Sequence, residues 1–393
     1  MTRDTSSEPH ARSHRFVPSL QFSKPALRSS RRTSPRGVTL TEIAVSIVAI
    51  ACLAAVIVPT LGAGRSRSRE LKSLANLKTL AAAHAAYAAD WSDRQFTHMP
   101  DELALAPTYP QFIDQFGCPQ PITLGFGASA ADPKTTSTWA FWLPCHGAQG
   151  NANSFQAFWP FPLGGNVNGA MFELCNAVGF NEYVGGRFMD PTFYAPADEW
   201  RLSEVGPGLA SEHPFTFTSG AGEPWMSSYI LSPAAMYHPV VFGGGPSGLF
   251  VVPTSTPLSS VSPTVSQCAH PELKSRMTEH SWLQSPPLPR NPAFTGASMP
   301  FHFNLGSAST PMTLFFDGHV AGMSIRKVVE ENADAVAAGG FGESLWIIPN
   351  GIGPWAAYGG YYSAVAQWDA GSENSVHVFT RKGILGRDGL TPY

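Results

Sequence analysis

The chain has 393 residues, of which 43% are hydrophobic and 13% are charged. Soluble globular proteins usually contain about 25% charged residues, so this chain is charge-poor, yet its hydrophobic content is too high for a disordered protein. The 37 Gly and 35 Pro residues argue against an all-helical bundle and favour many turns and short strands. A net charge of −3 gives no electrostatic footprint for nucleic-acid binding.

The first segment, residues 1–37, differs from the rest in charge. It carries eight basic and two acidic side chains, a formal charge of +6, so residues 38–393 carry −9 to give the total of −3. The segment has little apolar periodicity, which predicts that it is disordered. We therefore expect a basic leader followed by an acidic remainder.

An uncharged apolar run of 19 residues extends from Ile43 to Leu61. A helix needs about 20 such residues to cross a bilayer. An ordinary signal peptide is the alternative, because Arg31-Arg32 looks like a twin-arginine motif and Gly62-Ala63-Gly64 offers small residues for cleavage. The run is longer than most cleaved signal cores, which favours retention in the membrane. Basic residues flank it equally on both sides, so charge alone does not orient it.

Glu42 stands at the start of this run. A carboxylate carried toward the bilayer centre costs about 2.5–3.5 kcal/mol and is a functional-site hypothesis that needs a partner. The segment Pro35-Arg-Gly-Val-Thr-Leu-Thr-Glu42 resembles the type IV prepilin signal, in which Gly precedes a hydrophobic residue, Thr-Leu and then Glu. Pro59 falls where many pilins carry a helix-kinking proline.

The resemblance implies a processing and assembly site. A prepilin peptidase would cut between Gly37 and Val38 on the cytoplasmic side, and the new amino terminus of Val38 would be methylated. Glu42 would then pair with the amino terminus of a neighbouring pilin-like subunit. The implied location is a single pass through the inner (cytoplasmic) membrane, with the leader cytoplasmic and the head periplasmic or extracellular, including a place in a surface filament.

A second helical pattern follows the apolar run. Apolar residues recur at helical spacing, and neither Gly nor Pro occurs between Arg65 and Met99. The positions of this pattern are Leu71, Leu74, Leu77 or Lys78, Ala81, Ala85, Ala88 and Trp91. We expect one nearly continuous helix from about Thr39 to Asp90, kinked at Pro59, with a membrane half at 38–61 and an amphipathic half at 62–91. Asn76-Leu77-Lys78, followed by Tyr87 and Asp90, resembles the pseudopilin pattern ahead of the globular head.

Residues 92–393 predict a turn-rich head with insertions. The patterns favour an α+β fold, in which a mostly antiparallel β-sheet with large loops packs on the second half of the long helix. Strands are predicted at 240–242, 249–252, 312–316 and 375–380, and a short helix at 330–338.

The strongest local pattern in the head is Leu314-Phe-Phe-Asp-Gly-His-Val320. Asp-Gly between apolar runs predicts a two-residue hairpin turn with positive φ at both residues. With His302 before it, the run resembles the C-terminal signature of a large pilin-like family of unknown function. Segments 195–198 and 227–229 stand where that family has two further motifs. The signature residues are His302, Asp317, Gly318 and His319.

The head contains residue types that can bind metals or form disulfides. His302, Asp317 and His319 are types that bind metals, but a turn aspartate and hydrogen-bonded histidines explain them, and we expect no metal and no cofactor. Four cysteines lie in the head, and in an exported head they could form two disulfides with three connectivities, or remain buried thiols. They are Cys118, Cys145, Cys175 and Cys268.

The sequence contains no G-x-S-x-G, H-E-x-x-H or P-loop motif, and we do not expect an enzyme. The leading hypothesis is a pilin-like or pseudopilin subunit that assembles through its N-terminal helix into a pilus or a type II secretion pseudopilus. The alternative is a membrane-anchored surface module with a large recognition head that does not polymerise. The charge of −9 after residue 37 disfavours nucleic acid as its ligand.

Overall fold

The structure is a computed structural model, and it describes a defined part of the chain. The described residues are 37–97, 102, 105–117, 122–126, 138–141, 154–155, 173–175, 178–187, 190–198, 202, 205–206, 209–210, 226–243, 262–279, 310–346 and 380–393. Several predicted features lie outside them, namely the leader up to residue 36, Cys118, Cys145, His302, and the strands at 249–252 and 375–379.

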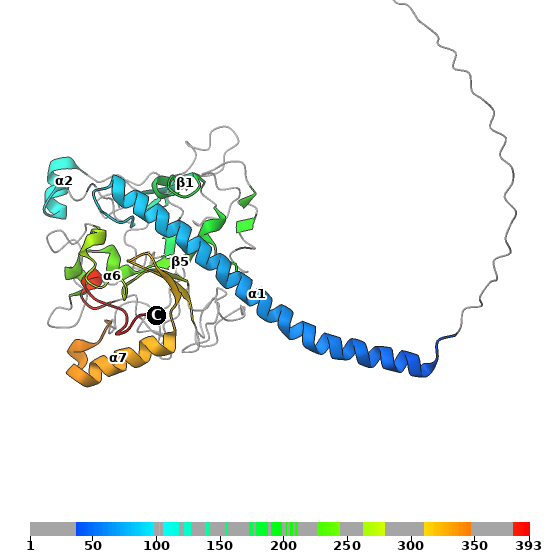
Figure 1. Cartoon of the computed structure of the whole chain (residues 1–393). Coiled ribbons are helices and arrows are strands. Elements are labelled where there is room, and N and C mark those ends of the chain that lie inside the picture. The colour runs from blue at the N-terminus through cyan, green and yellow to red at the C-terminus, as the bar shows by residue number, and fades with distance from the viewer. Residues whose placement is uncertain are drawn as a thin grey trace, which may run out of the picture. The chain divides into compact units, whose positions relative to one another are not determined.

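A single long helix dominates the N-terminal part of the chain (Figure 1). Helix α1 spans Leu40–Asp90, 51 residues, and continues through Pro59. Its sequence is rich in Ala and Leu, which have high helix propensity. The long-helix prediction is confirmed, whereas the kink at Pro59 stays a prediction. The chain divides into two compact units, Met1–Thr60 and Leu61–Tyr393, and α1 contributes to both.

The head contains a five-stranded antiparallel sheet among its described residues. Its strands are β4 (Glu173–Cys175), β5 (Met226–Leu231), β6 (Ser275–Glu279), β7 (Met312–Phe315) and β8 (Val320–Gly322), in the order β4-β5-β6-β7-β8. A smaller sheet joins β1 (Ile122–Phe126) and β2 (Thr138–Phe141) antiparallel, with β3 (Ser154–Phe155) parallel to β2. Helix and antiparallel sheet together make the α+β fold that the sequence predicts.

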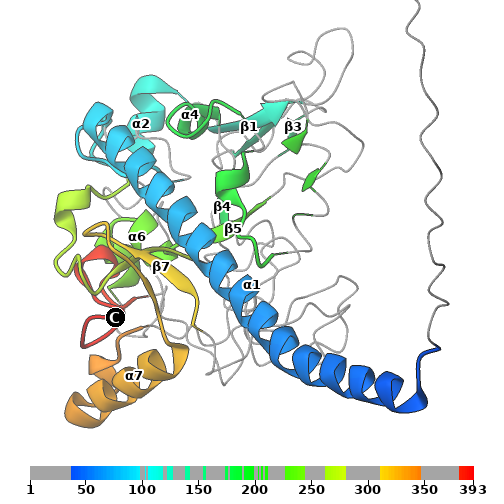
Figure 2. The same ribbon diagram turned by 45° about the vertical axis from the view of Figure 1, so that its right-hand side comes forward.

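The second half of α1 lies along this sheet, beside β5 and β7 (Figure 2). Leu77, Leu80 and Tyr87 are buried in one core with residues of the sheet such as Met277 and Leu314. The buried face differs from the predicted one, because Leu71 and Trp91 are 52% and 46% exposed. Small alanines carry little apolar area, so the leucines and Tyr87 decide which face turns inward.

Shorter helices surround the sheet. They are α2 (Tyr109–Phe116), α4 (Val178–Asn181), α6 (Pro233–Met236) and α7 (Ile325–Gly339), with 3-10 turns η3 (Pro191–Phe193), η4 (Pro239–Phe242), η6 (Val265–Gln267), η9 (Phe341–Glu343) and η10 (Gly383–Leu385). The predicted helix at 330–338 is confirmed and longer, because the side chain of Ser324 caps its start by accepting a hydrogen bond from Lys327 N.

The strand prediction at 240–242 is wrong, because these residues form η4. Pro239 stands at its first position, where a fixed φ favours a helical turn. His238 Nδ1 accepts a hydrogen bond from Val240 N at 3.3 Å and satisfies a donor at the start of the turn.

The hairpin β7–β8 is confirmed, but its turn differs from the predicted two-residue type. Phe315 N donates to His319 O and Gly318 N donates to Phe315 O, both at 3.0 Å, which encloses a three-residue loop. Gly318 has φ +85°, while Asp317 is absent from the described residues with positive φ. A three-residue loop needs one left-handed residue at its end, and glycine takes that position at no steric cost.

We expect Gly318→Ala to destabilise the fold by about 1–2 kcal/mol, because an added Cβ meets open space and the cost is backbone strain alone. Gly342→Ala is the matched control, since that glycine also has open space around it and no positive φ. Thermal denaturation of the full chain in detergent checks the difference. Equal melting temperatures for the two variants would contradict the turn assignment.

Candidate functional site

The residues of the predicted processing site lie at the exposed start of α1. A Cβ on Gly37 would have nothing within 4 Å, and Val38 is 69% exposed. The backbone on either side of the Gly37–Val38 bond is therefore accessible in the described structure.

Thr39 and Glu42 form a reciprocal capping box at the start of α1. Thr39 N and Thr39 Oγ1 both donate to Glu42 Oε2 at 2.8 Å, and Glu42 N donates to Thr39 Oγ1 at 3.3 Å. A carboxylate in the first turn also interacts favourably with the helix dipole. The prepilin resemblance assigns Glu42 only a partner on another subunit, and this local role adds to it, although T-x-x-E before an apolar run signals a capping box.

The first half of α1 presents its apolar side chains outward. Among the described residues from Val38 to Leu61, eleven large apolar side chains are between 48% and 86% exposed. Of the helices described, α1 alone is long and apolar enough to cross a membrane. This segment is an exposed apolar surface of a length that suffices to cross a bilayer.

The second half of α1 is joined to the sheet by buried hydrogen bonds. Ser73 Oγ lies 2.9 Å from Tyr229 Oη and also donates to Glu279. Asn76 Nδ2 donates to Tyr194 O at 3.0 Å and to Tyr229 Oη at 3.3 Å. Burial raises the pKa of Glu279 and the pKa of Tyr229. These contacts fix the helix in one register on the sheet.

The two head segments predicted from the family resemblance meet each other here. Ser228 Oγ donates to Asp198 Oδ2 at 2.7 Å, and both residues are buried. Tyr229, next to Ser228, reaches α1 as described above. Segment 227–229 therefore reaches the interface between the helix and the head through Tyr229, and segment 195–198 is joined to it through Asp198.

The Asp-Gly-His turn also reaches α1. Lys78 Nζ donates to Gly318 O at 2.7 Å, and Asp317 Oδ1 accepts from His319 N at 3.0 Å and lies 2.6 Å from His319 Nδ1. The described part of the chain contains no group of three or more His, Cys, Asp or Glu side chains suited to a metal ion. Asp317, Gly318 and His319 thus shape a turn that the helix holds.

Two of the four cysteines predicted to form disulfides, Cys175 and Cys268, lie in the described part of the chain. Cys268 is a free thiol, so the two-disulfide arrangement that includes it differs from the structure. Its side chain is half-buried and packs with Ala235, Phe316 and Ile384, and burial raises the pKa of Cys268 to about 11. It behaves as a small apolar group. Cys175 lies in β4.

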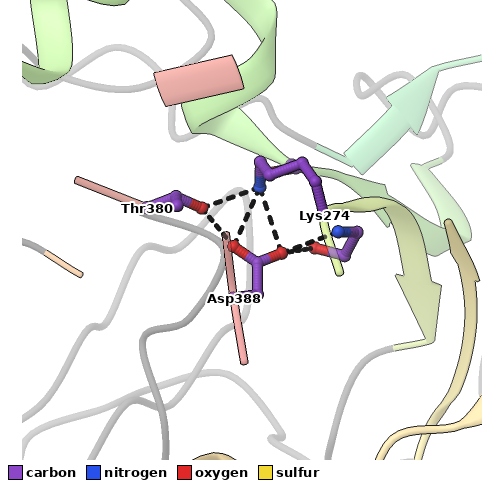
Figure 3. Close-up of polar contacts among 5 residues, drawn as sticks. Lys274, Thr380 and Asp388 are labelled. Carbon is purple, nitrogen blue, oxygen red and sulfur yellow. Dashed lines mark hydrogen bonds and ion pairs between the residues drawn. The ribbon is translucent and has the colours of Figure 1, made fainter. Parts of the chain in front are cut away.

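A fully buried ion pair anchors the C-terminal segment (Figure 3). Lys274 Nζ lies 3.0 Å from Asp388 Oδ1 and donates to Thr380 Oγ1 at 2.7 Å and to Ser232 Oγ at 2.8 Å. Ser275 N donates to Asp388 Oδ2 at 2.7 Å. Burial lowers the pKa of Lys274, and the charge of Asp388 counters part of that effect. Sequence reasoning missed this pair, which joins residues 114 apart in the chain.

This network has the residue types of a serine–lysine catalytic pair, but its lysine is buried and paired with a carboxylate. The side chains of Lys274 and Asp388 are 0% exposed, and the lysine is held by a carboxylate. A general base needs a free lone pair and access to substrate. The arrangement therefore fits a structural clamp between β6 and the last described segment.

A second buried cation stands near the end of α1. Arg276 on β6 is 6% exposed, and its Nε and Nη2 have no hydrogen-bond partner among the described residues. His84 on α1 is 0% exposed, both of its ring nitrogens lack partners, and its ring lies 4.6 Å from the Phe180 ring. Burial and the nearby Arg276 charge hold the pKa of His84 well below its usual value. No sequence motif indicates that either residue is buried without hydrogen-bond partners.

Comparison with protein-family models, curated proteins and solved structures returns no match for this chain.

We expect Asp388→Ala to destabilise the fold by about 3–5 kcal/mol, because it leaves the Lys274 ammonium buried and unpaired. The double variant Lys274→Met/Asp388→Leu should recover part of that loss, since it removes both charges from the interior but leaves Ser275 N without its acceptor. Glu70→Ala is the control, because its ion pair with Arg67 is solvent-exposed and contributes little. Chemical denaturation of the full chain in detergent measures all three, and a double variant as unstable as the single one would contradict the clamp.

Proposed function

We propose that this chain is a pilin-like structural subunit, processed by a prepilin peptidase between Gly37 and Val38 and assembled with other subunits through α1. The observation that carries the proposal is the division of α1 into two halves with opposite surroundings. Its apolar half follows directly on a prepilin-like signal and is exposed, whereas its second half is buried against its own head. One helix thus offers an association segment and a fixed attachment to the head.

The exposed half of α1 fits both states of the proposed subunit, in the membrane before assembly and among other subunits afterwards. Eleven exposed large apolar side chains suit lipid before assembly and neighbouring apolar helices afterwards. The chain would wait as a single-pass protein of the inner membrane, with its head outside the cytoplasm. It would then join a pilus or a type II secretion pseudopilus.

Glu42 supports the proposal through the oxygen that the capping box leaves open. Both Thr39 donors bind Oε2, so Oε1 has no hydrogen bond among the described residues. The amino terminus of Val38 on a neighbouring subunit could bind Oε1 without opening the box. Such a pairing would neutralise a carboxylate that is costly inside the membrane.

A membrane-anchored binding module is the second candidate. It shares the anchor and differs in remaining unpolymerised, and a cavity beside Arg276 favours it by offering room for a ligand. The two candidates are separated by whether the apolar halves of α1 touch one another in the membrane.

Replacing Gly37 with a bulky residue should block maturation, since the peptidase would read the residue before the cut bond. In the native host, mass spectrometry of the wild-type chain should find a methylated Val38 at the amino terminus. The Gly37→Leu chain should keep its leader. An unprocessed wild-type chain, or cleavage after Gly64, would falsify the prepilin assignment.

Cys52, an exposed free thiol on the apolar half of α1, reports on helix contacts. Oxidative crosslinking in native membranes should give Cys52-linked dimers in the wild type, and Glu42→Ala should reduce them several-fold. Glu42→Gln is the matched control, because glutamine retains the capping box but loses the charge. We expect both variants to insert and both to lose crosslinks. If Glu42→Gln crosslinks at the same level as the wild type, the role of Glu42 is restricted to capping. If the wild type itself does not crosslink, the unpolymerised binding module is favoured.

A further inference from the structure

A cavity of about 490 Å³ lies between the second half of α1 and the sheet. Its apolar walls come from Ala81, Ala85 and Ala88 of α1 and from Leu314, Phe315 and Phe316 at the end of β7. Its volume falls in the range of small-molecule sites, which are mostly apolar with a few well-placed polar groups. The exposed Ala85 marks the open side of the cavity.

Arg276 is the cation of this cavity. Its Cζ lies 5.4 Å from the centre of the Phe316 ring, so the guanidinium and that ring line the same wall. Burial lowers the pKa of Arg276 to about 10, which leaves the group charged at neutral pH. Removing one partner from a buried charge is strongly destabilising in general, so a buried guanidinium with two unpartnered nitrogens is an unusual feature to retain.

The carboxylates at the cavity make no direct ion pair with Arg276, although the charge of Asp93 acts on it and raises its pKa. Asp93 Oδ2 accepts a hydrogen bond from Ser266 N at 3.0 Å, and Asp317 is held by His319. Neither forms an ion pair with Arg276 in the part of the chain that the structure describes. The neighbouring His84 offers no negative charge, because an imidazole is neutral or cationic.

We propose that this cavity binds an organic carboxylate with an apolar body. The carboxylate accepts hydrogen bonds from the Arg276 guanidinium, and the body lies against the alanines of α1 and the apolar end of β7. A guanidinium binds a carboxylate through charge-assisted hydrogen bonds, which are stronger than neutral ones. The ligand supplies a directly hydrogen-bonded counter-charge, which no described residue provides.

Two sources could present this chemistry. One is a free small acid. The other is an acidic side chain of a second copy of this chain, which carries −9 after residue 37, and this source rests on the proposed function. A cavity on one copy and a carboxylate elsewhere on the next make a head-to-tail contact, the type that generates open filaments.

The first arm of the experiment uses phenylacetate as the probe and phenylacetamide as its neutral counterpart, titrated calorimetrically into the full chain in detergent micelles. We expect saturable binding of phenylacetate and at least tenfold weaker binding of the amide. Arg276→Met should abolish binding and raise the melting temperature, since it removes an unpaired buried charge; a purely structural arginine would give the opposite shift. Ala85→Phe should fill the cavity with Arg276 intact, whereas Ala82→Phe, exposed on the same helix and outside the cavity, should bind normally.

The second arm measures self-association of the same chains by sedimentation without added acid. Self-association that Arg276→Met weakens at least tenfold, and that phenylacetate competes away, assigns the carboxylate to a second copy. Phenylacetate binding without Arg276-dependent association assigns it to a free acid. Equal binding of acid and amide, or neither binding nor Arg276-dependent association, overturns the proposal. Cys52 crosslinking reads the helix contacts separately, so the failure of this site and the failure of subunit assembly remain distinguishable.

Discussion

The hydrogen bonds that join Ser73 and Asn76 to Tyr229 and Glu279 are the constraint on which the head depends. An apolar helix face could slide or rotate on an apolar sheet with little change in buried area. Buried donors and acceptors do not permit this, because any shift would break the hydrogen bonds that Ser73 and Asn76 make to a buried carboxyl group and a buried phenol. The cavity beside Arg276 and the contact of Lys78 with the Asp-Gly-His turn follow from the register that these bonds set.

The Lys274–Asp388 pair has a similar role at the other end of the sheet. It ties β6 to the last described segment, and Glu331 of α7 holds the same segment by accepting hydrogen bonds from Leu390 N and Thr391 Oγ1, each at 2.6 Å. A chain rich in Gly and Pro forms few long elements, so distant segments are held by specific polar contacts rather than by extended ladders. These contacts compensate for short strands and short helices.

Features that depend on local periodicity could be predicted from the sequence, whereas contacts between residues far apart in the chain could not. The span of α1, α7 and the hairpin at Asp317 could be read from spacing and turn residues, whereas the buried face of α1 could not, because alanines are nearly neutral between faces. The Lys274–Asp388 pair and the Arg276 cavity join residues far apart in the chain, and no local pattern encodes them. The turn at 316–318 was predicted as a hairpin with the wrong length, since Asp-Gly serves more than one turn type.

The capping box at the start of α1 has a consequence for the order of events around it. Thr39 and Glu42, which form it, both lie after the Gly37–Val38 bond, so removal of the leader would leave the first turn of the helix already closed. Cutting the chain there would add a positive charge two residues before Leu40 without unwinding anything behind it. The first turn of the helix would keep its hydrogen bonds after the cut. Maturation would therefore change the charge at the start of the helix but not its conformation.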